Sequence, residues 1–385
     1  MTPADAVAAA RAVAGRLHED VVARERANRP PRAEIQLLRG SGLLAADPDD
    51  LETTHLVTRI IAASDASIGH LLGYHYTHLW RARLYDNADL ARRLRQDVRA
   101  EGLFVASVSN PRDTIVATTT ADTFTVSGRG AFATGCAVAD RILVGAIRDD
   151  QESRIVVVVP GDADGLSHPP DWDNLGQRLT ASGSIVLRDV TAGPADVLGT
   201  FPPGEDETSP RWQQLSLVSL AFQTVLTQIL VGITEGALDE AARYTREQSR
   251  PWPASGLARA VDDPHVLAGY GELAASLHAA RLLADDATRA LAKADRRGLD
   301  LTPAERGRTA LTVSAAKVVA TRLAMEATSR IFELTGARAT TRSSGLDRFW
   351  RDARTLTVHD PVTYKARELG THLLTGNPPP TTAYS

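Results

Sequence analysis

The hydrophobic residues of this chain change their spacing twice, and the two changes divide it into three regions. Residues 1–100 and 211–385 place apolar residues three and four positions apart, which is the period of an amphipathic helix. Residues 101–200 instead contain short β-branched runs separated by Gly, Pro, Asp and Asn, which is typical of antiparallel strands. We therefore predict an α+β fold that is mostly α, with an N-terminal helical domain, a central antiparallel β domain and a C-terminal helical bundle.

The first region contains two stretches with a clear helical pattern, Ala4–Ala27 and Leu56–Leu72. Asp65 and Ser67 precede a further helical segment, Ile68–Arg83, at the position where an N-cap residue belongs. We expect a helix to begin at this point.

The second region has four β-branched runs, and a segment with three prolines and three acids follows it. That segment, Phe201–Pro210, is typical of a solvent-exposed linker. The predicted strands are Thr123–Ser127, Arg141–Ile147, Arg154–Val159 and Ser184–Val190.

The third region predicts three long helices, Leu215–Tyr244, His265–Ala294 and Pro303–Leu334, with Gly336 as the C-cap of the last one. Their apolar surface lies on more than one side, which indicates oligomerisation, because one face of a bundle must cover another. One apolar face of the first helix is formed by Val218, Phe222, Val225, Ile229 and Ile233.

Charge and cysteine content exclude several classes of protein. The net charge of −4 and the pI near 6.2 give no basic surface for nucleic acid. Cys136 is the only cysteine, so no intramolecular disulfide forms, and no Cys/His zinc spacing is present. No basic leader opens the chain and no uncharged apolar run of spanning length stands out, so we expect no membrane segment and a cytoplasmic location.

Four stretches, in the right order along nearly the whole chain, resemble motifs of the acyl-CoA dehydrogenase superfamily. The first, a flavin-contacting turn, is followed by Ala139-Asp140 and an apolar strand. The second is similar to the superfamily signature that closes the β domain. The four stretches are Gly128-Arg-Gly-Ala-Phe-Ala-Thr-Gly135, Leu175–Val190, Ala237–Arg246 and Arg351-Asp-Ala-Arg354.

A narrower branch of the superfamily, that of dibenzothiophene monooxygenase, is similar at further positions. Val105 stands where that branch has an active-site asparagine, and the loop after Gly42-Leu-Leu44 is shorter, so the resemblance does not fix the substrate. The similar stretches are Ala66–His75, Arg250-Pro-Trp252, Gly345–Thr355 and Val358–Lys365.

This resemblance implies a two-component enzyme that uses reduced FMN (FMNH2) and O₂. It would form a flavin hydroperoxide and transfer one oxygen atom to N, S or an aromatic carbon of a small organic substrate. The sequence has no dinucleotide fingerprint after a strand, so the reduced flavin would come from a separate NAD(P)H:flavin reductase. The resemblance also implies a homotetramer.

Two alternatives share the same fold. An FAD-dependent acyl-CoA dehydrogenase needs a glutamate base, and Asp360 occupies the matching position. Its side chain is one methylene shorter and it precedes a proline, which restricts its backbone to extended conformations. The other alternative is a catalytically silent, flavin-free protein.

The resemblance further assigns residues to the flavin. Phe132, Ala133 and Thr134 correspond to the flavin-contacting turn, with Thr134 as a hydrogen-bond donor beside the flavin N5. Trp172 corresponds to a tryptophan at the border of the flavin and the substrate. Arg250 corresponds to a phosphate-binding arginine that is often contributed by a neighbouring subunit, and its planar fork suits phosphate oxygens.

The remaining assignments concern catalysis and the substrate pocket. His359 resembles the family's active-site histidine and could donate or accept a proton near neutral pH. His70 and Tyr74 are four apart, so they share one helix face. By resemblance that face looks into a pocket that Val105, Trp172 and Asp360 also line. Without the resemblance, a lone histidine on a helix is more often structural, and Tyr74 and Trp172 fit a plain core equally well.

The histidines of the same segment do not have the spacing of a metal site. His75 and His78 are three apart, but His70 lies five residues before His75 and points elsewhere. No acidic residue falls on the shared face, so we predict no metal.

Overall fold

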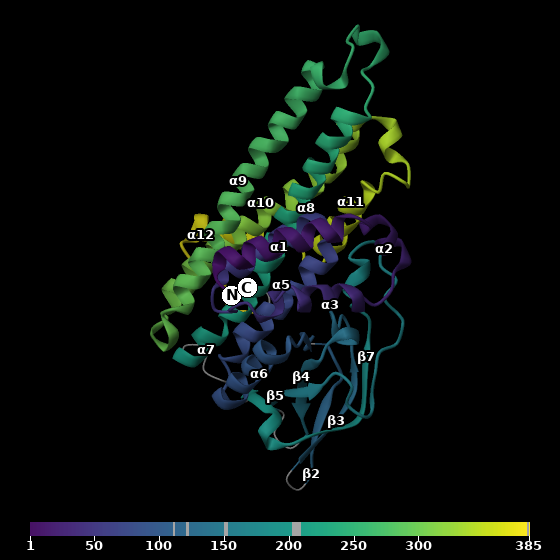
Figure 1. The fold of residues 1–385 in the computed structure, drawn as a ribbon. Coiled ribbons are helices and arrows are strands. Elements are labelled where there is room, and N and C mark those ends of the chain that lie inside the picture. Colours follow the sequence, from purple (N-terminus) through teal and green to yellow (C-terminus); the bar gives the residue numbers. More distant parts are fainter. Residues whose placement is uncertain (111, 121–122, 150–152, 202–208, 383–384) are drawn as a thin grey trace.

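The computed structural model describes residues 1–110, 112–120, 123–149, 153–201, 209–382 and 385. Figure 1 shows a sheet at one end, a long helical bundle at the other, and the N-terminal helices between them. The two ends of the predicted linker are placed, because Phe201 ends a strand and Pro210 begins a helix. Residues 202–208 of that linker lie outside the described residues.

The N-terminal region forms six helices, and two of the predicted helical stretches are broken. Ala4–Ala27 is interrupted after His18, and Leu56–Leu72 is interrupted at Asp65. Asp65 is the expected N-cap, because its Oδ1 accepts the N–H of Ile68 at 3.2 Å. The helices are α1 (Pro3–His18), α2 (Val21–Ala27), α3 (Arg32–Gly40), α4 (Leu51–Ser64), α5 (Ala66–Ala82) and α6 (Ala88–Glu101).

The central region forms one sheet in the order β6-β7-β3-β2-β4-β5-β8, with β1 also paired to β4. The four predicted strands are present as β3, β4, β5 and β7. The strands are β1 (Val105–Val108), β2 (Val116–Thr120), β3 (Thr123–Gly130), β4 (Arg141–Arg148), β5 (Arg154–Pro160), β6 (Leu166–Ser167), β7 (Ile185–Ala192) and β8 (Val197–Phe201).

The sheet is mixed, so the prediction of a purely antiparallel domain is wrong at β4. Both β1 and β2 pair with β4 in parallel, while the β2–β3, β3–β7, β4–β5, β5–β8 and β6–β7 pairs are antiparallel. Strand β1 pairs with the first half of β4, Arg141–Val144, and strand β2 pairs with the end of β4, Ile147–Arg148. The composition of a segment predicts that it forms a strand, but it does not predict which strand it pairs with or in which direction.

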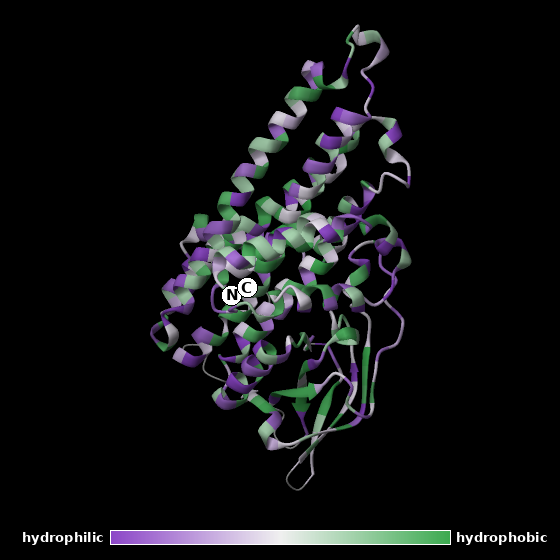
Figure 2. Cartoon of the chain, in the orientation of Figure 1, coloured by the Kyte–Doolittle hydropathy of each residue, from purple (hydrophilic) through white to green (hydrophobic). Residues whose placement is uncertain are grey.

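The three helices predicted for the C-terminal bundle are present, and each begins and ends within three residues of its predicted bounds. Thr302 and Glu305 form a capping box at the start of α10, and Gly336 ends that helix with φ 83°. Along α9, hydrophilic and hydrophobic residues alternate in short bands (Figure 2). The helices are α7 (Pro210–Leu215), α8 (Leu217–Glu247), α9 (Pro264–Asp295), α10 (Pro303–Thr335), α11 (Asp347–Thr357) and α12 (Val362–Thr375).

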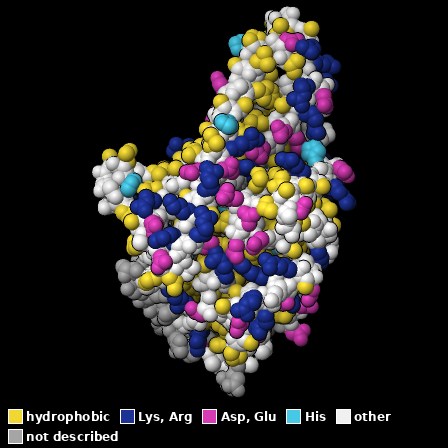
Figure 3. Space-filling view, turned by 60° about the vertical axis from the view of Figure 1, so that its left-hand side comes forward, with side chains coloured by type: hydrophobic (Ala, Val, Ile, Leu, Met, Phe, Trp, Pro, Cys, Tyr) yellow, Lys and Arg dark blue, Asp and Glu magenta, His cyan; other side chains and the backbone are white. Residues whose placement is uncertain are grey.

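Helix α8 is the centre of the bundle. The helical segment 210–247 is long and apolar enough to cross a membrane, contrary to the expectation from the sequence, but 89% of its most apolar window is buried inside the protein. Helices α4, α5, α9 and α10 pack against α8 and cover it. The second apolar face expected on this helix is therefore covered within the chain. Exposed hydrophobic side chains instead lie along the projecting end of the bundle (Figure 3).

Candidate active site

One face of α5 carries a line of aromatic and imidazole rings. His70, Tyr74 and His78 follow one another at a spacing of four residues, so the face predicted for the first two is confirmed. The ring centroids of His70 and Tyr74 are 4.3 Å apart, and those of Tyr74 and His78 are 5.8 Å apart, both edge to face. Phe222 of α8 packs edge to face on Tyr74 at 5.1 Å. The rings thus lie where α5 meets α8.

His70 also connects α5 to the β domain. Its Nδ1 lies 3.1 Å from Oε1 of Gln177. The backbone oxygen of Gln177 accepts the indole N–H of Trp172 at 2.9 Å and the hydroxyl of Thr180 at 2.8 Å. The predicted residues His70 and Trp172 are therefore brought together through Gln177, a residue that the sequence did not single out.

The turn after β3 presents an exposed aromatic side chain. Phe132 is 67% exposed, has a φ of 54°, and lies edge to face with Trp172 at 6.4 Å. Ala133 is buried, and its N–H donates to the oxygen of Gly183 at 3.0 Å. Phe132 and Trp172 thus form an aromatic surface beside a turn that is fixed by backbone hydrogen bonds.

The hydroxyl of Thr134 begins a chain of hydroxyl groups. Thr180 donates to the oxygen of Gln177, and Ser182 donates to Thr180 Oγ1 at 2.7 Å. The proton between Thr134 Oγ1 and Ser182 Oγ, which are 2.8 Å apart, therefore comes from Thr134. The Thr134 N–H is also used, because it donates to the oxygen of Phe132 at 2.9 Å. In this arrangement Thr134 offers an acceptor, whereas the sequence suggested a donor.

His359 and Asp360 lie in the turn between α11 and α12, beside a lysine that the sequence did not single out. His359 Nδ1 is 3.1 Å from Asp360 Oδ1, and Lys317 Nζ of α10 is 3.6 Å from the same oxygen. Burial acts to raise the pKa of Asp360, but the hydrogen bond from His359 and the charge of Lys317 outweigh it and hold this pKa below its usual range. Asp360 is therefore a carboxylate that orients the imidazole of His359, and it is a poor base for an acyl-CoA.

A cavity of about 480 Å³ connects this turn to the surface. His359, Asp360, Tyr364 of α12 and Pro378 are among the residues that line it. The side chain of His359 is 39% exposed, whereas that of Asp360 is 8% exposed. His359 therefore lies between solvent and the buried residues.

Val105 is fully buried in β1, and its N–H donates to His75 Nδ1 at 3.0 Å. It faces the same side of the strand as Ser107, because strand residues two apart share a face. Ser107 accepts a hydrogen bond from Arg81 Nη2 at 2.6 Å. His75 uses both ring nitrogens, since Nε2 lies 2.9 Å from the oxygen of Leu44, so its imidazole is engaged within the core.

Arg250 is a predicted site residue that lies away from the flavin-contacting turn. It is exposed in the connection between α8 and α9. Figure 1 shows this connection at the end of the bundle farthest from the sheet.

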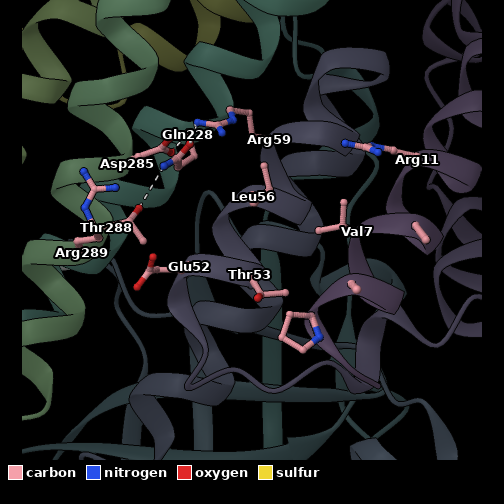
Figure 4. A pocket seen from close by; sticks show the side chains of 13 residues that line it. Val7, Arg11, Glu52, Thr53, Leu56, Arg59, Gln228, Asp285, Thr288 and Arg289 are labelled. Atoms are coloured by element: carbon pink, nitrogen blue, oxygen red, sulfur yellow. Dashed lines mark hydrogen bonds and ion pairs between the residues drawn. The ribbon is translucent and has the colours of Figure 1, made fainter.

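A separate hollow of about 590 Å³ lies between α1, α4, α8 and α9 (Figure 4). Arg59 donates to Gln228 at 3.1 Å and to Asp285 at 2.7 Å, and Gln228 donates to Thr288 at 3.1 Å. These polar groups are paired with one another, and none of the predicted site residues lines this hollow.

Burial keeps several histidines neutral, which predicts a pH dependence of stability. It lowers the pKa of His55, His70 and His75 to about 4 and that of His78 well below 6.5. In the unfolded chain these histidines are protonated below about pH 6.5, whereas in the folded chain they stay neutral until the pH is near 4. The contribution of the neutral histidines to the free energy of unfolding is therefore complete above pH 6.5 and is lost as the pH falls towards 4. Each histidine should lower the free energy of unfolding by about 2 kcal/mol at pH 5.

Urea unfolding between pH 8 and pH 5 measures this dependence. In His55→Gln, which removes one of the four groups, the free energy of unfolding should fall less steeply with pH, by about 2 kcal/mol over this range. A free energy of unfolding that stays constant from pH 7 to pH 5 would contradict the neutral state of these side chains.

Comparison with known proteins extends over the whole chain. Residues 224–364 match the family model described as acyl-CoA dehydrogenase, C-terminal domain. The chain is 34% identical over 393 residues to the probable FMNH2-dependent monooxygenase SfnC of Pseudomonas putida, covering 100% of this chain and 98% of that protein.

Two solved structures have the same fold. Dibenzothiophene monooxygenase TdsC from Paenibacillus sp. A11-2, solved with FMN and indole, has a TM-score of 0.93 and 36% identity, with 99% of each chain covered. Methanesulfinate monooxygenase MsuC from Pseudomonas fluorescens has a TM-score of 0.93 and 33% identity, with 100% of each chain covered.

Proposed function

The chain belongs to the FMNH2-dependent monooxygenases that have the acyl-CoA dehydrogenase fold, and we propose that it oxygenates a small organic substrate in the buried space between α5, α8 and α10. Its cofactor is reduced FMN and its co-substrate is O₂, as the family resemblance implied. SfnC and its relatives share this use of flavin, so the dehydrogenase and the silent protein remain only as outcomes of the test below.

The residues on the β domain fit an aromatic cofactor. Phe132 is exposed beside Trp172, and at the edge of this aromatic surface His70 Nε2 and Gln177 Nε2 are buried without a hydrogen-bond partner. An aromatic ring system with a polar edge would cover the apolar rings and give these nitrogens partners. We assign the flavin to Phe132, Ala133, Thr134 and Trp172, and its phosphate to Arg250 of a neighbouring subunit.

Reduced FMN, when bound, supplies the electrons that activate O₂. Thr134 would accept a hydrogen bond there, because its own proton is directed to Ser182. Reduced flavin carries an N–H at N5 and oxidised flavin does not, so an acceptor favours the reduced form. The Thr134–Ser182–Thr180 chain thus supports a preference for reduced over oxidised FMN.

His359 would transfer a proton, and His70 would offer a neutral hydrogen-bond acceptor. Asp360 fixes the proton of His359 on Nδ1, which leaves Nε2 to accept a proton or, once protonated, to donate it. His70 stays neutral at physiological pH because burial lowers its pKa to about 4, and its Nε2 has no protein partner. Burial also raises the pKa of Tyr74, which keeps its hydroxyl protonated as a hydrogen-bond donor. Val105 and Trp172 would form apolar walls of the same pocket.

The substrate would be oxygenated at N, S or an aromatic carbon. The names of TdsC and MsuC give dibenzothiophene and methanesulfinate as substrates of relatives, and these two molecules differ widely in size. A separate NAD(P)H:flavin reductase would deliver the reduced FMN, because the sequence has no dinucleotide fingerprint of its own. A cytoplasmic location gives access to that partner.

The observation that carries this function is the unpartnered His70 Nε2, buried between the aromatic surface of the β domain and the helical pocket. The test supplies reduced FMN and O₂ to the purified protein with a panel of heterocycles, amines and sulfur compounds. Mass spectrometry should detect a product with one additional oxygen atom. A yellow protein that retains FAD and is bleached by an acyl-CoA would identify a dehydrogenase, and a protein that binds neither form of FMN would be a silent member.

We further propose a homotetramer. Exposed hydrophobic side chains lie on α9, on the α8–α9 connection and on α12, and Figure 3 shows those of the projecting bundle. Light scattering at micromolar concentration should give a mass near four times 41.2 kDa. A monomer with full activity would contradict both the assembly and the role of Arg250 from a neighbour. The exposed residues are Trp252, Leu267, Leu282, Tyr364, Leu373 and Leu374.

A further inference from the structure

Among the described residues, two buried cations, Arg81 and Lys317, and the carboxylate of Asp360 lie near Tyr74. Lys317 is 1% exposed, and its Nζ lies 3.6 Å from Asp360 Oδ1, beyond the length of a hydrogen bond. Arg81 is 5% exposed, bonds to the Ser107 hydroxyl, and has its guanidinium 5.5 Å from the ring centroid of Phe222. Among the ion pairs of the described residues, none joins Arg81 to a carboxylate.

Several buried polar atoms without a hydrogen-bond partner lie on the helices that carry Tyr74, Phe222 and Lys317. Phe222 packs against both Tyr74 and His78, and the adjacent Gln223 is close enough to Asp360 to lower its pKa through a hydrogen bond. An unsatisfied buried polar atom destabilises the folded state, so native proteins keep few of them without a reason. Within the described residues, the atoms concerned are His78 Nδ1, Arg81 Nε, Gln223 Oε1, Lys317 Nζ and Thr321 Oγ1.

The charges in this space do not balance. Burial keeps His70 and His78 neutral because it lowers their pKa values, and it keeps Tyr74 protonated. Lys365 also acts on Lys317, but it is paired with Glu368, so these two charges cancel. The charged groups that remain are Lys317, Arg81 and Asp360, with one positive charge in excess. Burial lowers the pKa of Lys317, so an anion that binds beside it would also help it to keep its proton.

We infer that the substrate carries a compact oxyanion, a carboxylate or a sulfinate, that binds between Lys317 and Arg81 while the rest of the molecule extends towards His70. Oxyanions accept the strong charge-assisted hydrogen bonds that ammonium and guanidinium groups donate. A neutral heterocycle would leave Arg81 without a carboxylate and Lys317 with only the ion pair to Asp360 at 3.6 Å, so one buried positive charge would stay uncompensated. The inference rests on the proposed function and narrows its substrate class.

Direct binding to the flavin-free protein tests the inference. Isothermal titration compares benzoate with benzamide, and methanesulfinate with dimethyl sulfoxide, since the members of each pair have nearly the same shape. In at least one pair the acid should bind about tenfold more tightly or better, because charge-assisted hydrogen bonds are about twice as strong as neutral ones. Equal affinity within both pairs, or no binding of either acid at millimolar concentration, would overturn the inference.

Variants test whether Lys317 causes the preference for the acid. Lys317→Met keeps the length and removes the charge, so the ratio of the two affinities should fall to about one. Lys317→Met/Asp360→Asn should behave in the same way and leaves no unpaired carboxylate if the single variant unfolds. The matched control is Lys365→Met, because Lys365 is equally buried but is already bonded to Glu368 at 3.0 and 3.2 Å.

The control should keep the preference for the acid, and thermal unfolding verifies that each variant is folded. An unchanged preference in both Lys317 variants would assign the anion to another place and overturn the inference. No flavin is present in the titration, so a preference for acids without any oxygenation by the flavin-loaded enzyme would overturn only the proposed function.

Discussion

Replacing His359 by alanine is expected to lower the amount of oxygenated product per reduced flavin consumed by about a hundredfold to ten-thousandfold. The imidazole is held by Asp360 at 3.1 Å and lies at the border of the buried pocket and an open cavity. A positioned proton donor or acceptor accounts for a rate factor of this size. The fold should survive, because a side chain that is 39% exposed contributes little to packing.

The measurement pairs product formation with flavin oxidation in single turnovers. His372→Ala is the matched control, since His372 is an exposed histidine of α12 whose Nδ1 contacts only a backbone oxygen, that of Asn377. It should keep the wild-type ratio of product to flavin. If His359→Ala kept this ratio and lost only thermal stability, His359 would be a structural residue and its proposed role would be wrong.

Gly236→Ala is expected to destabilise the protein strongly, although alanine normally stabilises a helix by about 1 kcal/mol relative to glycine. A Cβ at Gly236 would lie 1.9 Å from the backbone oxygen of Ala63, at the crossing of α8 and α4. Backbone cannot move aside as a flexible side chain does, so the two helices must separate. We expect a loss of about 3 kcal/mol or more in the free energy of unfolding.

Gly271→Ala should change the free energy of unfolding in the opposite direction, although Gly271 also lies in a helix. Gly271 lies in α9, and a Cβ there would meet no atom within 4 Å. This variant should gain about 0.5–1 kcal/mol in the free energy of unfolding. Urea denaturation of both variants measures the difference, and equal stability of the two would mean that α8 and α4 are not in close contact at Gly236.

Local features of the sequence determined the elements of the fold. The capping box of Thr302 and Glu305 and the glycine at position 336 mark the ends of α10, and Asp65 marks the start of α5. Each works through atoms only three or four residues away, so its effect can be read without knowing the fold. The shared face of His70 and Tyr74 follows from the helical period in the same way. The resemblance to a flavin-dependent family added the cofactor, and the comparisons with known proteins confirmed it.

Only the tertiary structure decided which distant groups meet. The parallel pairing of β1 and β2 with β4 joins edges that no local pattern distinguishes. Lys317 is one lysine in a run of alanine and valine, a signal that could have marked it as buried, yet its partner Asp360 lies on another segment. The direction of the Thr134 proton likewise depends on Ser182, which β-domain folding brings to it. A charge or a hydroxyl takes its role from its neighbours in space, and long-range packing sets those neighbours.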